Sequence, residues 1–274
     1  MNNKNKIIFL GTAGEEQVVA RQQRKAGGII LLLEGFQFHL EPGPGSLELM
    51  KLAKLHPRET IALLATNNSL IRSNDVNAGI SAMTLGGLDK HGVFLGSKSV
   101  IEGLENEQSR LLPFYKNCVE GLMSFNPRNK IGINTVNIMP VANKQRDETA
   151  VGLVFNISDN KIGYTGDTSY FEELSKNFSG VNVLIINCKH PKSITEKGCM
   201  NIDDAVKLIE QVEPRIAILT SFGSKLLEKD IFMLGRNLQI KNKVTTIVMA
   251  KDGLSINIDD YSDKVKQTTI KGFS

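Results

Sequence analysis

The chain has 274 residues, of which 41% are hydrophobic and 23% are charged, the composition of an ordinary globular protein with one large domain or two small ones. Its net charge of +4 comes from 33 basic and 29 acidic residues, and it contains no Trp. The basic residues are scattered, whereas nucleic-acid binding proteins cluster them beside stacking aromatics, so we do not expect a nucleic-acid partner. The longest apolar runs hold only five residues, and a membrane span needs about 18, which excludes a membrane protein.

The three cysteines, Cys118, Cys188 and Cys199, are widely spaced. They form neither a disulfide framework nor a Cys-x-x-Cys pair. The polar N-terminus leads directly into the first apolar run and lacks the features of a secretory signal. We therefore expect a cytoplasmic protein.

Short runs rich in β-branched residues and leucine, most of them bounded by Gly, Pro, Asn or Asp, predict strands along the whole chain. In chain order they cover residues 7–10, 29–33, 36–40, 61–65, 92–95, 133–139, 152–157, 161–164, 183–187, 216–219, 245–249 and 255–258.

The clearest helix signal lies late in the chain. Asn201 can cap a helix over residues 202–212, where apolar residues recur at helical spacing, and Pro214 ends it. Other helices are predicted over residues 46–55, from 73 or 74 to 83, 169–177 and 228–238. Strands grouped at hairpin spacing, followed by strand–helix–strand units, indicate an α/β protein with mixed sheets.

Four segments that follow predicted strands resemble, in order and spacing, the metallo-β-lactamase superfamily. They are Glu41-Pro42-Gly43-Pro44-Gly45, the segment 65–75, Tyr164-Thr165-Gly166-Asp167-Thr168 and Leu219-Thr220-Ser221-Phe222-Gly223. The similarity covers about residues 6–258, and the Asp252-Gly253 pair of a late hairpin also fits. It implies a four-layer αββα sandwich of the metallo-β-lactamase type, with residues 1–274 forming a single domain.

Active relatives in the superfamily hold one or two metal ions, usually zinc, on histidine and carboxylate side chains. The resemblance therefore also implies which positions of this chain correspond to those metal ligands. The motif positions of those ligands fall here on Asn67, Ser69, Ile71, Arg72, Gln145 or its neighbour Lys144, Asp167 and Ser221. Relatives closest in pattern carry a further histidine where this chain has Cys199.

Only Asp167 keeps a ligand type of the family. Asn and Ser are poor zinc ligands, Ile has no donor atom, and Arg72 is a permanent cation that repels a divalent ion. The histidines at positions 39, 56, 91 and 190 match none of the ligand positions. We therefore expect no catalytic residues at this site and no zinc or other divalent metal as cofactor.

A buried Asp167 without a metal needs another counter-charge. We expect Arg72 to supply it through a hydrogen-bonded contact. Simpler structural interpretations apply to several of these residues: a turn role for Asp167, Asn67 and Asn68, a core position for His39, a loop position for His190, and a small buried hydrophobe at Cys199.

The favoured function is a catalytically degenerate member of the superfamily that acts as a scaffold, an interaction subunit or a small-anion sensor. In the sensor, a remnant pocket binds the anion and Arg72 supplies the charge. The residues expected to line that pocket are Asn67, Ser69, Arg72, Gln145, Asp167 and Ser221.

The alternative is a hydrolase of the superfamily with a remodelled or relocated active site. In it, Ser69 or Ser221 would be activated by a base such as Lys144. Nucleic-acid processing, known in some relatives, depends on the metals whose ligands are missing here. A protein partner, a homo-oligomer and a metal site elsewhere, for example around Cys188 and His190, are left open by the sequence.

Overall fold

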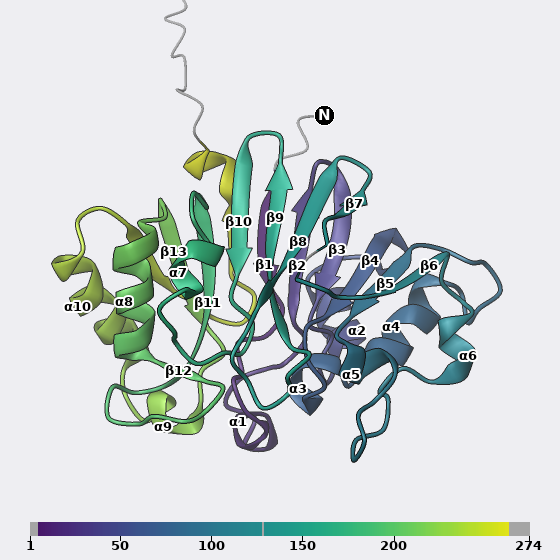
Figure 1. Cartoon of the computed structure of the whole chain (residues 1–274), viewed down its shortest axis with the longest axis horizontal. Helices are drawn as coiled ribbons and strands as arrows, with labels where there is room; N and C mark the ends of the chain where they lie inside the picture. Colours follow the sequence, from purple (N-terminus) through teal and green to yellow (C-terminus); the bar gives the residue numbers. More distant parts are fainter. Residues whose placement is uncertain (1–4, 128, 263–274) are drawn as a thin grey trace, which may run out of the picture.

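The computed structural model describes residues 5–127 and 129–262, which fold around two facing β-sheets (Figure 1). The first sheet has the strand order β15 (Ser255–Asn257), β1 (Lys6–Phe9), β2 (Ile29–Leu33), β3 (Phe36–Leu40), β4 (Thr60–Ala65), β5 (Val93–Gly96) and β6 (Gly121–Ser124). The second has the order β14 (Thr246–Met249), β13 (Ile216–Thr220), β11 (Val183–His190), β10 (Asn160–Tyr164), β9 (Val151–Ile157), β8 (Val136–Ala142) and β7 (Ile131–Ile133), and β12 (Met200–Asn201) pairs with β11.

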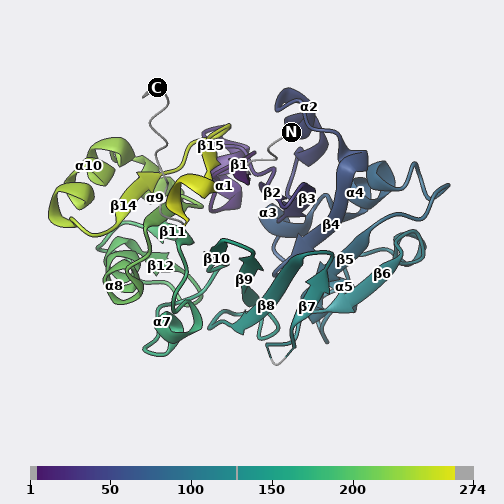
Figure 2. The ribbon, with the colours of Figure 1, turned by 90° about the horizontal axis from the view of Figure 1, so that it is seen from above.

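Helices cover the outer faces of both sheets, as the view from above shows (Figure 2). The first sheet carries α2 (Ser46–Leu52), α4 (Val76–Met83) and α5 (Lys98–Ile101), and α6 (Pro113–Lys116) lies beside α4 and α5 (Figure 1). The second carries α7 (Leu174–Asn177), α8 (Ile202–Val212) and α10 (Ile231–Lys241). The expected four-layer αββα sandwich is thus confirmed, and no helix in the described part of the chain is long and apolar enough to span a membrane.

The main core lies between the two sheets. Phe38 of β3 meets Phe155 of β9 edge to face, with 6.5 Å between ring centroids. Strands of both sheets contribute further buried side chains to this core, such as Leu31 and Ile185. Burying this apolar surface between two sheets is the dominant favourable term for a fold of this type.

The helix predicted from regularly spaced apolar residues agrees with the structure. The helix over residues 202–212 is confirmed as α8, with Asn201 accepting the Asp204 N–H in a capping box. The strand expected over residues 133–139 is confirmed as β8 only from Val136 onward, because Asn134 adopts a positive φ of 50° and a turn separates β7 from β8. The helix expected over residues 169–177 is reduced to its last turn, α7, and β6 and β12 were not predicted.

The topology brings the carboxyl ends of several strands to one edge of the sandwich. Strands β3, β4 and β5 run parallel in the first sheet. Strands β10, β11, β13 and β14 run parallel in the second. The short helices α1 (Glu16–Ala20), α3 (Leu70–Ser73) and α9 (Ser224–Leu227) lie at this edge, at the bottom of Figure 1. Segments distant in sequence therefore meet here, as they do at the ligand-binding edge of other α/β sheets.

Candidate functional site

A largely buried polar contact at this edge joins Arg72 of α3 to Asp167, which follows β10. The Arg72 Nε donates to Asp167 Oδ2 at 2.9 Å and Nη2 donates to Oδ1 at 2.7 Å. The Arg72 side chain is 7% exposed and that of Asp167 is 17% exposed. The contact expected from the sequence is therefore confirmed, and its two-pronged geometry is the one that suits guanidinium and carboxylate groups.

Two asparagine amides complete the hydrogen bonding of Asp167. Asn67 Nδ2 donates to Oδ2 at 3.2 Å, and Asn187 Nδ2 donates to Oδ1 at 2.8 Å. Ser221 Oγ in turn donates to Asn187 Oδ1 at 2.8 Å. We call Asn67, Arg72, Asp167, Asn187 and Ser221 the inner group. Each carboxylate oxygen of Asp167 accepts two hydrogen bonds, which uses its lone pairs.

Asp167 and Arg72 each stabilise the charged form of the other, although both side chains are largely buried. Burial disfavours the charged form of Asp167, but the Arg72 guanidinium and the hydrogen bonds from Arg72, Asn187 and Asn67 outweigh it and hold the pKa of Asp167 below its usual range. Likewise, burial opposes the charge of Arg72, and Asp167 more than offsets it, so the pKa of Arg72 is raised. Both groups are therefore charged at neutral pH and form a buried ion pair.

Glu41 is the residue that follows β3, and its carboxyl interacts electrostatically with Arg72 and Asp167. It is 1% exposed, and its carboxyl accepts the Thr66 N–H at 3.2 Å and a short hydrogen bond from the Thr66 hydroxyl. Burial raises the pKa of Glu41 to about 8, although the charge of Arg72 acts in the opposite direction. Glu41 thus offers little negative charge to a cation at neutral pH.

The inner group does not fit the zinc site of the resemblance. The only retained carboxylate, Asp167, has both oxygens engaged, and a cationic guanidinium lies against it. The amide of Asn67 and the hydroxyl of Ser221 already serve other partners. Zinc needs several imidazole, thiolate or carboxylate ligands at about 2.0–2.3 Å, and this group supplies none that is free.

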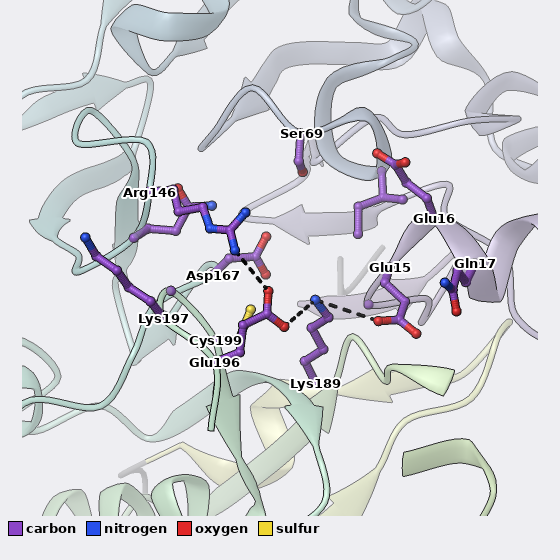
Figure 3. Close-up of a pocket in the computed structure, with 14 residues that line it drawn as sticks. Glu15, Glu16, Gln17, Ser69, Arg146, Asp167, Lys189, Glu196, Lys197 and Cys199 are labelled. Carbon is purple, nitrogen blue, oxygen red and sulfur yellow. Dashed lines mark hydrogen bonds and ion pairs between the residues drawn. The ribbon is translucent and has the colours of Figure 1, made fainter. Parts of the chain in front are cut away.

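A cavity of about 400 Å³ lies next to the inner group, and Asp167 is the member of that group that lines it (Figure 3). Three of the six residues expected to form a remnant pocket, Ser69, Gln145 and Asp167, line it. The other three, Asn67, Arg72 and Ser221, are buried and are not among its lining residues. The remaining lining residues are Gly14, Glu15, Glu16, Gln17, Ile71, Arg146, Lys189, Glu196, Lys197, Gly198 and Cys199.

A second cluster lies on the floor of this cavity, where β11 ends and the chain turns towards β12. Lys189 Nζ lies 2.9 Å from Glu196 Oε2 and 3.7 Å from Glu15 Oε2. His190 Nε2 lies 2.6 Å from the same Glu196 oxygen. The Cys199 N–H donates to the Glu196 carbonyl at 3.2 Å, which places the two side chains together. We call Lys189, His190, Glu196 and Cys199 the outer cluster.

In the outer cluster, Lys189 and Glu196 stabilise each other's charged forms, and the thiol of Cys199 beside them is neutral. Burial opposes ionisation of Glu196, but hydrogen bonds from Lys189 and His190 outweigh it and lower the pKa of Glu196. The pKa of Lys189 is raised, because its bond to Glu196 and nearby negative charges outweigh burial. Burial raises the pKa of Cys199 to about 12. The thiol is therefore protonated at neutral pH and is a poor nucleophile.

The sequence left open a metal site around Cys188 and His190, but Glu196 and Cys199 were not predicted as site residues. In the structure Cys188 is fully buried in the core, and His190 lies instead beside Glu196 and Cys199. Cys199 was interpreted as a buried hydrophobe, yet it is half-exposed and lines the cavity. His190 was assigned to a loop, yet it is buried at the end of β11. His39, by contrast, is a core residue as expected, with Nε2 2.8 Å from the Gly27 carbonyl oxygen.

The serine chemistry of the alternative hydrolase has no base in this geometry. Ser221 donates its proton to an amide oxygen of Asn187. The buried Ser69 Oγ has no hydrogen-bond partner within residues 5–127 and 129–262. Lys144 lies over the Phe171 ring, 4.6 Å from its centroid. Neither serine is therefore activated in the way that nucleophilic catalysis requires.

Comparisons with known proteins agree with this architecture. A family model described as the β-lactamase superfamily domain matches residues 78–222. An uncharacterised protein of Methanocaldococcus jannaschii, MJ1374, is 27% identical over 267 residues, which cover 97% of this chain and 98% of that protein. The metallo-β-lactamase fold protein YhfI from Bacillus subtilis has a TM-score of 0.75 at 16% identity, covering 92% of this chain and 99% of its own. A diphosphatase of the PhnP family has a TM-score of 0.68 at 13% identity, covering 92% and 97%.

Proposed function

Because the chain belongs to the β-lactamase superfamily domain family, we propose that it is a member that retains the cavity of the fold and has lost the metal centre, and that it acts as a receptor for a small anion. The observation that carries this proposal is the hydrogen bonding of Asp167, whose two oxygens accept four hydrogen bonds, two of them from Arg72. A guanidinium that fills the counter-charge role of a metal beside Asp167 leaves no Lewis acid at that position to activate water.

The anion would bind on one side of the cavity. Arg146 and Lys197 lie on that side, opposite Glu15 and Glu16 (Figure 3). Arg72 supplies no charge to the cavity, because Asp167 engages it. Arg146 is 78% exposed and only loosely paired, with its Nη2 4.0 Å from a Glu196 oxygen, so its planar fork is available to a phosphate.

The whole cavity is not uniformly positive. Its lining holds four carboxylates and three basic side chains, and Arg72 below it balances the fourth carboxylate. Selectivity would therefore come from the position of Arg146 and Lys197, with the amide of Gln145 as a neutral partner. The similar structure of a diphosphatase supports a phosphate-bearing anion as the first probe.

We also propose that the protein is cytoplasmic. All three cysteines are free thiols, as expected for a reducing compartment.

The test is thermal unfolding with inorganic pyrophosphate at low ionic strength. At a hundred times the dissociation constant, a ligand stabilises the fold by about 2.7 kcal/mol, which raises Tm by roughly 5–10 °C for a chain of this size. Replacing both Arg146 and Lys197 by Gln should abolish the rise. Replacing Lys225, an exposed lysine paired with Glu228 elsewhere on the surface, should leave it unchanged.

Absence of a shift with pyrophosphate, phosphate and nucleoside diphosphates would contradict the proposal. So would a shift that survives in the double variant, or hydrolysis of these compounds that requires Asp167.

A further inference from the structure

We propose that the outer cluster is a binding site for one transition-metal ion, with zinc the best match, held by His190, Glu196 and Cys199. His190 and Glu196 are not at positions where the family resemblance puts metal ligands, and Cys199 stands where relatives carry a further histidine. One nitrogen, one oxygen and one sulfur ligand atom, one from each side chain, lie within 4.8 Å of one another. The three residues are separate from the inner group, and metal binding by them does not depend on the anion.

The chain geometry holds these three side chains together before any metal arrives. His190 is fixed because β11 pairs with β12 beside it, with His190 opposite Asn201. Glu196 and Cys199 face each other across an isolated bridge, closed by Gly198 with a φ of +87°. A preformed site of this kind needs side-chain rotations and no refolding, which lowers the ordering cost of binding.

The donor set suits zinc. Imidazole nitrogen, carboxylate oxygen and thiolate sulfur are its usual ligands, and tetrahedral bonds of about 2.0–2.3 Å separate ligand atoms by roughly 3.3–3.8 Å. The His190 Nε2 and Glu196 Oε2 atoms are 2.6 Å apart, so they must move apart slightly to admit the ion. Three protein ligands leave a fourth position open, and Cys199 and Glu196 line the cavity.

Charge balance also favours a divalent ion here. Carboxylate and thiolate together offset its two positive charges, and the thiol proton is released to solvent on binding. Lys189 now pairs with Glu196, but Glu15 lies 3.7 Å from the same ammonium. Glu15 therefore retains Lys189 when Glu196 turns to the metal, so that no buried charge is left unpaired.

The surroundings of His190 determine how tightly the site should bind a metal ion. The His190 Nδ1 is buried and has no hydrogen-bond partner in the described part of the chain. Ligating histidines normally donate this second N–H to an acceptor, and losing such an acceptor weakens metal binding by about 10–100-fold. We therefore expect affinity below that of a fully supported zinc site.

The experiment titrates the chelator-stripped full chain with Co²⁺, followed by absorption spectroscopy, and with Zn²⁺ by calorimetry. The expected result is one ion per chain, with the charge-transfer absorption of a thiolate–cobalt bond. Cys199→Ser should remove that absorption and weaken binding by more than about 100-fold, since it removes a direct ligand. Cys118→Ser is the matched control, because Cys118 is also a free thiol but is buried under the first sheet's helices.

Asp167→Asn separates this inference from the proposed function. Binding that survives Asp167→Asn and is lost in Cys199→Ser supports both. Binding that requires Asp167 overturns the proposed function. Absence of binding to the unaltered chain, or binding that survives Cys199→Ser, overturns the outer cluster as a metal site. Circular dichroism of each variant confirms folding, and His190→Gln repeats the test if the Cys199 variant is unfolded.

Discussion

The inner group and the outer cluster lie at the same edge of the sandwich, yet they differ in how completely their polar atoms are paired. Asp167 accepts four hydrogen bonds and lies against a buried guanidinium. The outer cluster borders the cavity, shares one Glu196 oxygen between Lys189 and His190, and leaves a thiol beside it. A fully paired polar network is a structural element, whereas an incompletely paired one retains the capacity to bind.

The largest expected effect comes from breaking the inner ion pair. Asp167→Asn leaves the buried charge of Arg72 without its counter-charge, and we expect a loss of about 3–5 kcal/mol in the free energy of unfolding. Urea denaturation measures it. Lys225→Met, which breaks an ion pair whose side chains are both 61% exposed, should cost less than about 0.5 kcal/mol. Equal losses in the two variants would show that the inner pair is not the buried network described here.

The next effect concerns a buried histidine that the fold keeps neutral. Burial lowers the pKa of His39 to about 4, although its bond to Gly27 acts in the opposite direction. The unfolded chain therefore binds a proton from about pH 6.5 downward while the folded chain does not, so stability is lost as the pH falls. Between pH 7 and pH 4 this loss is on the order of 3 kcal/mol.

The variant His39→Gln isolates that contribution, because glutamine carries no titrating group and can still donate to a carbonyl. The difference in unfolding free energy between the variant and the unaltered chain should shrink as the pH falls from 7 to 4. Parallel curves for the two proteins would show that His39 is protonated in the folded state.

The smallest effect compares Ser69, which lines the cavity, with Ser221, which is buried in the inner group. Ser221→Ala removes the hydroxyl that donates to Asn187 and should cost about 1 kcal/mol. Ser69→Ala removes a hydroxyl without a partner in the described chain and should change stability by less than about 0.5 kcal/mol. A larger loss at Ser69 would place that hydroxyl in the paired inner network.

Four of the five residues of the inner group could be predicted from the sequence, because they fall on motif positions after strands, and a lone Asp beside a substituted Arg implies a pair. Asn187 is the exception, because it lies within β11 and its hydrogen bond to Asp167 forms only in the folded chain. The outer cluster could not. His190, Glu196 and Cys199 come together through a turn between β11 and β12 that has no periodic pattern. Each residue alone has an ordinary structural interpretation, and only the folded turn shows that they converge.

The same contrast holds for the secondary structure. The helix α8 combined an Asn cap, helical apolar spacing and a following proline, so local and tertiary preferences agreed. The turn between β7 and β8 falls at Asn134-Thr135, where a β-branched residue masks the turn signal inside a β-branched run. The edge strand β6 has only four residues and begins with a glycine, so it gives little pattern to detect.

The most direct test of the central claim is the metal stoichiometry of the Cys199→Ser chain, in which the outer cluster is disabled, measured by mass spectrometry after exposure to zinc. If Arg72 has replaced the metal as the partner of Asp167, the variant should hold far less than one metal per chain. Near one metal per chain, lost when Asp167 is also changed to Ala, would show that the family's metal centre persists and would contradict the account.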